Sequence, residues 1–178
     1  ASRTLNDPAT TDFPTPAPVT PPPILEDGGP RLITQAELLA NAGDVDGDTL
    51  TATGLAIASG NGTLVDNGNG TWTYTPAAND ASAVSFSYTI SDGNGGSVAG
   101  SATLDLTPVN DLPTTTPVTL TPLLEDGGPR LIPQAELNAN ATDVDGDPLT
   151  ASGLVIASGN GTLVDNGNGT WTYTPAAN

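Results

Sequence analysis

An internal repeat with a fixed offset constrains the fold of this 178-residue chain more than any other feature. Residues 24–79 return as residues 123–178 without an insertion, so that Trp72 recurs as Trp171 at an offset of 171 − 72 = 99 residues. The two copies differ at seven positions. A period near a hundred residues is too long for a solenoid repeat and fits one small β-sandwich domain per copy.

Within each copy, Val, Leu, Ile and Thr alternate between turn residues, and this pattern favours an all-β fold over disorder. In the first copy it predicts strands at 50–58, 63–65, 71–75, 84–90 and 97–109, with a hairpin turn, Asp-Asn-Gly-Asn-Gly, at 66–70. Gly54 marks a predicted β-bulge, because the inward-facing positions change parity there. Thr34 and Glu37 have capping-box spacing, which predicts one helical turn. About seven short strands separated by turns are typical of an Ig-like sandwich.

The offset also predicts the domain boundaries. Residues 1–12 align with residues 100–111 and are interpreted as the last strand of a preceding repeat. We expect a Pro-rich linker at 13–23, a complete repeat at 24–111, a linker at 112–122, and a second repeat at 123–178 that lacks its last two strands. Two interpretations stay open: a window of a longer chain, or subunits that complete one another by strand complementation. Both interpretations predict a linear array. The first builds it from neighbouring repeats of one chain, and the second from identical chains.

The charge balance limits the partners and the chemistry. The chain has 20 acidic and 3 basic residues, for a net charge of −17, which argues against nucleic acid and anionic lipid as partners. It contains no His and no Cys, so the commonest general base and the thiol nucleophile are absent. No apolar run approaches the ~20 residues of a membrane span. Carboxylate pairs of the kind that glycosidases use are the remaining argument for an enzyme. We expect that the chain is not an enzyme.

Three aspartates at alternate positions around a glycine, Asp44, Asp46 and Asp48, recur as Asp143, Asp145 and Asp147. At an effective dielectric constant of about 20, two like charges 4 Å apart repel by on the order of 4 kcal/mol. A folded loop therefore needs a cation among the carboxylates, or side chains that spread into water. Dense hard oxygen ligands suit Ca²⁺, and a solvated acidic turn is the alternative. An EF-hand is excluded, because Thr49 and Leu55 stand where its Gly and Glu are required.

The motifs, taken in order, resemble the bacterial cadherin-like tandem repeats of large secreted adhesins. They are Leu-Ala-Asn at 39–41 before the acidic loop 44–48, Thr-Tyr-Thr-Pro at 73–76, Phe-Ser-Tyr at 86–88, Ser-Asp-Gly-Asn-Gly-Gly at 91–96 and Pro-Val-Asn-Asp at 108–111. The resemblance implies Ig-like sandwiches arranged head to tail, with Ca²⁺ at or near the domain junctions. The metal ligands that it implies are Glu26, Asp44, Asp46, Asp48, Asp92, Asn110, Asp111, Glu125, Asp143, Asp145 and Asp147. Ala42 stands where the family pattern has a further acidic residue.

These features predict a calcium-rigidified structural repeat of an extracellular adhesin, stalk or filament, acting at a bacterial cell surface or in a matrix. The alternative is a carbohydrate-binding module in which Trp72 and Tyr74 form an exposed platform for surface glycans. Core burial of both rings is the competing interpretation, and the solvent exposure of Trp72 separates the two.

Overall fold

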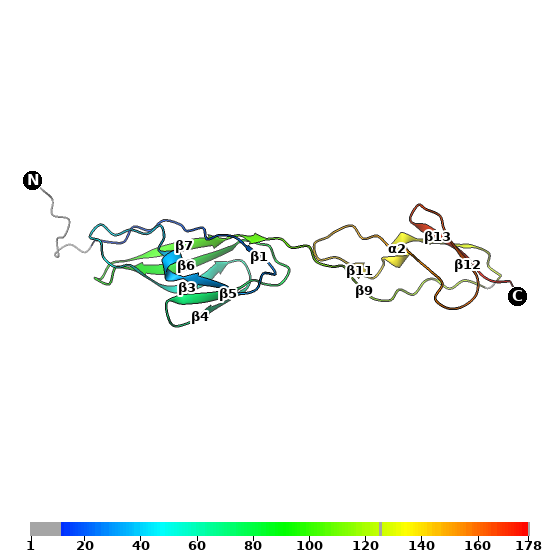
Figure 1. The fold of residues 1–178 in the computed structure, drawn as a ribbon, viewed down its shortest axis with the longest axis horizontal. Coiled ribbons are helices and arrows are strands. Elements are labelled where there is room, and N and C mark those ends of the chain that lie inside the picture. Colours follow the sequence, from blue (N-terminus) through cyan, green and yellow to red (C-terminus); the bar gives the residue numbers. More distant parts are fainter. Residues whose placement is uncertain (1–11, 125, 178) are drawn as a thin grey trace, which may run out of the picture. The chain divides into compact units, whose positions relative to one another are not determined.

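The computed structural model describes residues 12–124 and 126–177, which fall into two units, Ala1–Val109 and Asn110–Asn178 (Figure 1). The strands of both units confirm the predicted all-β sandwich class. In the described residues each unit also contains one four-residue helix, α1 (Gln35–Leu38) in unit 1 and α2 (Gln134–Leu137) in unit 2.

Two three-stranded antiparallel sheets form the sandwich of unit 1 (Figure 1). One sheet has the order β2 (Arg31–Thr34), β5 (Thr71–Thr75), β4 (Thr63–Asp66). The other has the order β3 (Thr51–Ser59), β6 (Val84–Ser91), β7 (Ser97–Leu104). A short parallel pair, β1 (Ile24–Leu25) with β8 (Leu106–Thr107), adds to them.

The core of unit 1 depends on the central strand β6. Its alternation places four apolar side chains inside, Val84, Phe86, Tyr88 and Ile90, each at most 4% exposed. The Phe86 ring meets the Tyr74 ring of the facing sheet edge-to-face, with centroids 5.4 Å apart and an interplanar angle of 86°. Such aromatic pairs add about 0.5–1.5 kcal/mol beyond the area that they bury. Strand β6 therefore joins the two layers.

Several local predictions are confirmed. Gly54 has a φ of +67°, and the β3–β6 register shifts between Thr53 and Ala56, as expected for a bulge. Strands β4 and β5 form the predicted hairpin. Thr34 caps α1 in a capping box with Glu37, whereas Pro133 at the start of α2 gives no side-chain cap. The strand predicted at 97–109 is instead two strands, since β7 ends at Leu104 and β8 begins at Leu106.

The Pro-rich segment predicted as a linker at 13–23 is part of the unit 1 sandwich, which corrects that prediction. Val19 is 6% exposed; its N–H donates to the Ser101 carbonyl (3.1 Å), and its carbonyl accepts from the Thr103 N–H (2.9 Å). Thr15 forms an antiparallel bridge with Gly43. Proline keeps a segment out of central strands but allows an edge position, and that is where this segment lies. The strand remnant predicted over residues 1–12 lies, except for Asp12, outside the described residues.

Unit 2 repeats the first half of this pattern. Its sheet has the order β10 (Arg130–Pro133), β13 (Thr170–Thr174), β12 (Thr162–Asp165), and Ile132 pairs with Trp171 as Ile33 pairs with Trp72. The segment 112–122, also predicted as a linker, contains β9 (Thr114–Thr115), which pairs with β11 (Ala141–Thr142). Residues 150–158, the counterparts of β3, form no strand in the part of unit 2 that the structure describes.

We expect Val19→Ala to lower the free energy of unfolding of unit 1 by about 2 kcal/mol, because it removes buried methyl groups and leaves a cavity. Urea denaturation followed by Trp72 fluorescence in a Trp171→Phe background measures this change. Thr20→Ala, at the exposed neighbouring position, is the control and should change stability by less than about 0.5 kcal/mol. Equal small effects of both substitutions would mean that the segment is a linker after all.

Candidate metal centre

The acidic loop of unit 1 closes around one oxygen of Asp44. Its Oδ1 accepts hydrogen bonds from the backbone N–H groups of Asp46 (2.9 Å) and Asp48 (3.2 Å). Gly47 makes this tight path possible, since its φ of +78° lies in the left-handed region that favours glycine. The backbone itself therefore gathers the three aspartates.

The three carboxylates converge at a spacing that fits one cation. One oxygen from each of Asp44, Asp46 and Asp48 lies within 4.8 Å of the other two. Calcium binds oxygen at about 2.3–2.6 Å, so two ligands of the same ion lie at most about 5 Å apart. In residues 12–124 and 126–177, this is the one acidic group with such convergence.

The second oxygen of Asp44 supports the same conclusion. Asp44 Oδ2 is buried and has no hydrogen-bond partner among the described residues. Burying a polar atom without a partner costs about 1–3 kcal/mol, and more when the group is charged. A cation between the aspartates would satisfy this oxygen, so the donor set fits Ca²⁺.

The loop between β6 and β7 lies against the acidic loop. Asn94 Nδ2 donates to Asp48 Oδ2 at 2.7 Å. Asp92, only 4% exposed, holds this loop in shape, because its Oδ1 accepts from the N–H groups of Asn94 (2.7 Å) and Gly96 (2.9 Å). A side chain at Gly96 would collide with the Asp92 carboxylate. Asp92 lies outside the converging group of three, and its role as a metal ligand stays a prediction.

Glu26 occupies the other end of unit 1. It is 4% exposed, its Oε1 accepts from the Val109 N–H at 2.8 Å, and its own N–H donates to the Thr107 carbonyl at 3.1 Å. The acidic loop lies beside the 92–96 turn, which precedes β7. Glu26 lies beyond the C-terminal end of β7. Eight residues of strand extend about 26 Å, so Glu26 does not reach the aspartates of its own unit.

The acidic loop of unit 2 repeats the backbone geometry with more exposed side chains. Asp143 Oδ1 accepts from the N–H groups of Asp145 (3.0 Å) and Asp147 (3.2 Å). The N–H of Asp111 donates to Asp145 Oδ2 at 2.7 Å, and Asn110 Nδ2 donates to the Asp111 carbonyl at 2.9 Å. Asp145 and Asp147 are exposed, whereas all three aspartates of the first loop are half-buried. Glu125 lies outside the described residues.

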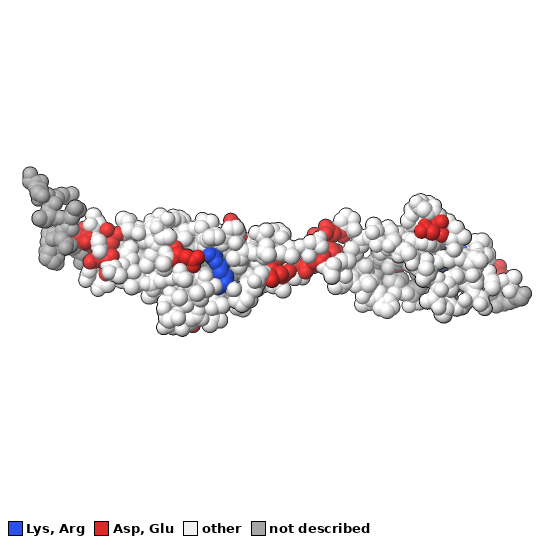
Figure 2. All heavy atoms as spheres, viewed as in Figure 1, with Lys and Arg blue, Asp and Glu red and all other residues white. Residues whose placement is uncertain are grey.

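No basic side chain that the structure describes is paired with the acidic loops. Arg31 pairs with Glu37 at 2.8 Å, and Arg130 pairs with Glu136 at 2.7 Å, each next to a helix. Figure 2 shows acidic side chains gathered in separate patches on the visible face, with little basic surface among them. Each of the two arginines that the structure describes is thus paired with a glutamate of its own unit.

The aromatic side chains are core residues. Trp72 is 3% exposed and Tyr74 is fully buried, with its hydroxyl donating to the Asn61 carbonyl at 2.6 Å. Burial raises the pKa of the Tyr74 hydroxyl above its usual value, and the nearby Asp80 charge adds to that effect. The carbohydrate platform predicted as the alternative function requires both rings at the surface, so this interpretation is wrong for these residues.

Comparison with known proteins assigns the fold family. The family model of the cadherin-like domain matches residues 11–107 and 109–178, and the chain belongs to this family. Cadherin-like domains are usually extracellular and typically bind calcium. Within the described residues, no helix has the length and apolar character needed to cross a membrane.

Solved structures with similarity to the chain include two endo-fucoidan hydrolases of glycoside hydrolase family 107. MfFcnA4 is 20% identical with a TM-score of 0.38, and the match covers 97% of this chain and 26% of that chain. MfFcnA9 is 20% identical with a TM-score of 0.33, and the match covers 94% of this chain and 30% of that chain. The chain thus spans less than a third of either enzyme, and similarity at this level assigns no activity. No curated protein sequence matches the chain.

We expect Asp44→Asn to lower the calcium affinity of unit 1 at least tenfold. Asparagine keeps an Oδ1 that can accept from the Asp46 and Asp48 N–H groups, but it places a donor where the buried Oδ2 lies. The loop should therefore keep its shape, and without calcium the variant should melt no lower than the parent. Calorimetric titration measures the affinity.

Asp66→Asn is the matched control, because Asp66 accepts from the Gly68 N–H in the exposed β4–β5 turn. It should bind calcium as the parent does. Equal affinity for calcium in both variants and the parent would place the metal site elsewhere.

Proposed function

We propose that this chain is a calcium-stabilised structural repeat of an extracellular bacterial adhesin, stalk or filament, and that it serves in surface attachment or matrix formation. One observation carries the proposal: Asp44, Asp46 and Asp48 each place an oxygen within 4.8 Å of the other two, and Asp44 Oδ2 is buried without a hydrogen-bond partner among the described residues. Membership of a family that is usually extracellular and typically binds calcium supports the same function.

The acidic loop is placed where a bound ion would stiffen the domain. Asp44 follows α1 and precedes β3 in the chain, and Asp48 contacts Asn94, which is 46 residues further along. When Asp44, Asp46 and Asp48 share one ion, their mutual repulsion becomes attraction to a common centre. The loop then holds α1, β3 and the 92–96 turn together at one end of the sandwich.

A stiff repeat of this kind can extend from a surface and bear load without catalysing a reaction. Binding to the folded state alone raises stability by about 2.7 kcal/mol when the free ligand is a hundredfold above its dissociation constant. Calcium concentrations outside cells would then keep the repeat folded under load. The proposal assigns no reaction to the chain, in which the His and Cys of common catalytic sites are absent.

We expect saturating Ca²⁺ to raise the melting temperature of the chain by roughly 10–20 °C over the same protein in chelator, from the 2.7 kcal/mol above and about 4–8 °C per kcal/mol for a small domain. Differential scanning calorimetry measures the shift. Sodium chloride at matched ionic strength is the control, since it screens repulsion without filling a site. Melting curves that coincide in calcium and chelator would refute the calcium-stabilised repeat.

A further inference from the structure

Each unit contains the sequence Asn-Gly-Thr where a hairpin of two paired strands turns. In unit 1 it covers residues 69–71, between β4 and β5, and in unit 2 it covers residues 168–170, at an offset of 168 − 69 = 99 residues. Asn-x-Ser/Thr, where x is not proline, is the acceptor sequence for N-linked sugars, which are attached at surface loops of secreted proteins. Asn69 and Asn168 are both exposed.

The hydroxyl of Thr71 fixes the direction in which the Asn69 side chain points. Thr71 Oγ1 accepts from Asn67 Nδ2 at 3.0 Å and donates to Asn69 Oδ1 at 2.7 Å. The amide oxygen of Asn69 is therefore engaged within the turn, and its Nδ2 is directed away from that hydroxyl. Among the described residues, the structure gives this Nδ2 no hydrogen-bond acceptor.

Unit 2 repeats this arrangement and identifies the two ends of the amide. Thr170 Oγ1 accepts from Asn166 Nδ2 at 2.9 Å and donates to Asn168 Oδ1 at 2.7 Å. The backbone N–H of Thr170 also donates to Asn168 Oδ1, at 3.2 Å. Because a backbone N–H can only donate, the atom that it meets is the amide oxygen, and the nitrogen is the outward end. Both hairpins therefore present an amide nitrogen to solvent.

Unit 1 has a second Asn-Gly-Thr sequence, at residues 61–63, whose amide is occupied. Asn61 Nδ2 donates to Asp80 Oδ2 at 2.5 Å, and the Asn61 carbonyl accepts from the buried Tyr74 hydroxyl at 2.6 Å. A Cβ at Gly62 would lie 2.7 Å from that same hydroxyl oxygen. This sequence is thus fastened to the core, and its nitrogen already has an acceptor.

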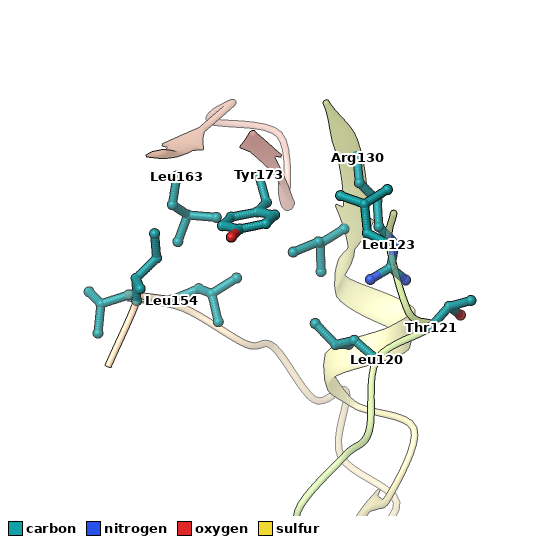
Figure 3. A pocket seen from close by; sticks show the side chains of 10 residues that line it. Leu120, Thr121, Leu123, Arg130, Leu154, Leu163 and Tyr173 are labelled. Carbon is teal, nitrogen blue, oxygen red and sulfur yellow. The ribbon is translucent and has the colours of Figure 1, made fainter. Parts of the chain in front are cut away.

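The counterpart of this second sequence in unit 2, residues 160–162, is also packed against an aromatic ring. The hydroxyl of Tyr173, whose ring is labelled in Figure 3, donates to the Asn160 carbonyl at 2.7 Å. A Cβ at Gly161 would lie 2.7 Å from a backbone carbonyl oxygen of β13, whereas a Cβ at Gly169 would meet nothing closer than 3.9 Å. An enzyme that holds all three residues of an acceptor sequence therefore has room around Gly169 and not around Gly161.

We propose that Asn69 and Asn168 are attachment sites for an N-linked sugar, one in each repeat. The donor is a sugar whose anomeric carbon is bonded to the diphosphate of a nucleoside or of a lipid. In the transfer, Nδ2 forms a bond to the anomeric carbon and the bond from that carbon to the diphosphate oxygen breaks. The diphosphate leaves with the electron pair, and one amide proton of Nδ2 passes to a base of the transferase. Thr71 and Thr170 are positioning residues that hold the amide oxygen.

The proposal draws on the extracellular location in the proposed function but does not depend on calcium. The rise in melting temperature with calcium is measured separately, so either result can fail alone.

Peptide mass spectrometry of the chain purified from the cells that produce it tests the proposal, with fragmentation that keeps sugars on their side chains. We expect a sugar on Asn69 and Asn168 and none on Asn61 and Asn160. A single sugar indicates a nucleoside diphosphate donor, and an oligosaccharide indicates a lipid diphosphate donor. Unmodified Asn69 and Asn168, or sugar on threonine hydroxyls alone, overturns the proposal.

Variants produced in the same cells test the acceptor sequence itself. Thr71→Ala keeps Asn69 but removes the hydroxyl, and should lower the fraction of Asn69 that carries sugar at least tenfold. Asn168 in the same molecule should keep its sugar, which shows that the variant has met the transferase. Thr71→Ser restores the hydroxyl and should restore the sugar, and Asn61→Gln is the control that should change nothing. Sugar that persists on Asn69 in Thr71→Ala, or that is lost in Asn61→Gln, overturns the proposal.

Discussion

The covering of one sheet face by strand β6 is the interaction on which the rest of unit 1 depends. Tyr74, Ile33 and Trp72 line the inner face of the β2–β5–β4 sheet, and each is at most 3% exposed. Phe86 from the middle of β6 reaches the Tyr74 ring, and β6 also pairs with β3 and β7 on its two sides. In unit 2 the corresponding sheet forms with the same register, since Ile132 pairs with Trp171 as Ile33 pairs with Trp72.

The geometry of the candidate metal centre follows from the same strand. The hairpin that closes the core also carries the 92–96 turn, and Asn94 in this turn donates to Asp48. In unit 2 the backbone bonds of Asp143 are intact, but Asp145 and Asp147 are exposed. The acidic motif therefore sets the same loop backbone in both units, and in unit 1 the 92–96 turn lies against it.

Features that depend on near neighbours in the chain could be predicted from the sequence. The Gly54 bulge, the β4–β5 hairpin and the Thr34 capping box each rest on residues a few positions apart. The position of Val19 could not, because its burial depends on pairing with Ser101 and Thr103, more than eighty residues away. Proline content predicts a linker there, but it says nothing about whether the backbone of that segment has a pairing partner.

Only part of the candidate metal site could be predicted from the sequence. Alternate aspartates around Gly47 indicate a cation loop, and the structure brings Asp44, Asp46 and Asp48 together. Glu26 belongs to the same motif series but lies at the opposite end of unit 1, because the chain crosses the length of the sandwich between them. The contact of Asn94 with Asp48 depends on the packing of two distant loops, and no spacing in the sequence encodes it.

The most direct test of calcium as the resident ion is anomalous X-ray diffraction from crystals of the chain grown in calcium. The account predicts an anomalous peak between Asp44, Asp46 and Asp48, with Asp44 Oδ2 and an oxygen of each other carboxylate at about 2.3–2.6 Å. The peak should be absent from crystals of Asp44→Asn. Well-ordered carboxylates at millimolar calcium with no peak among them would contradict the account.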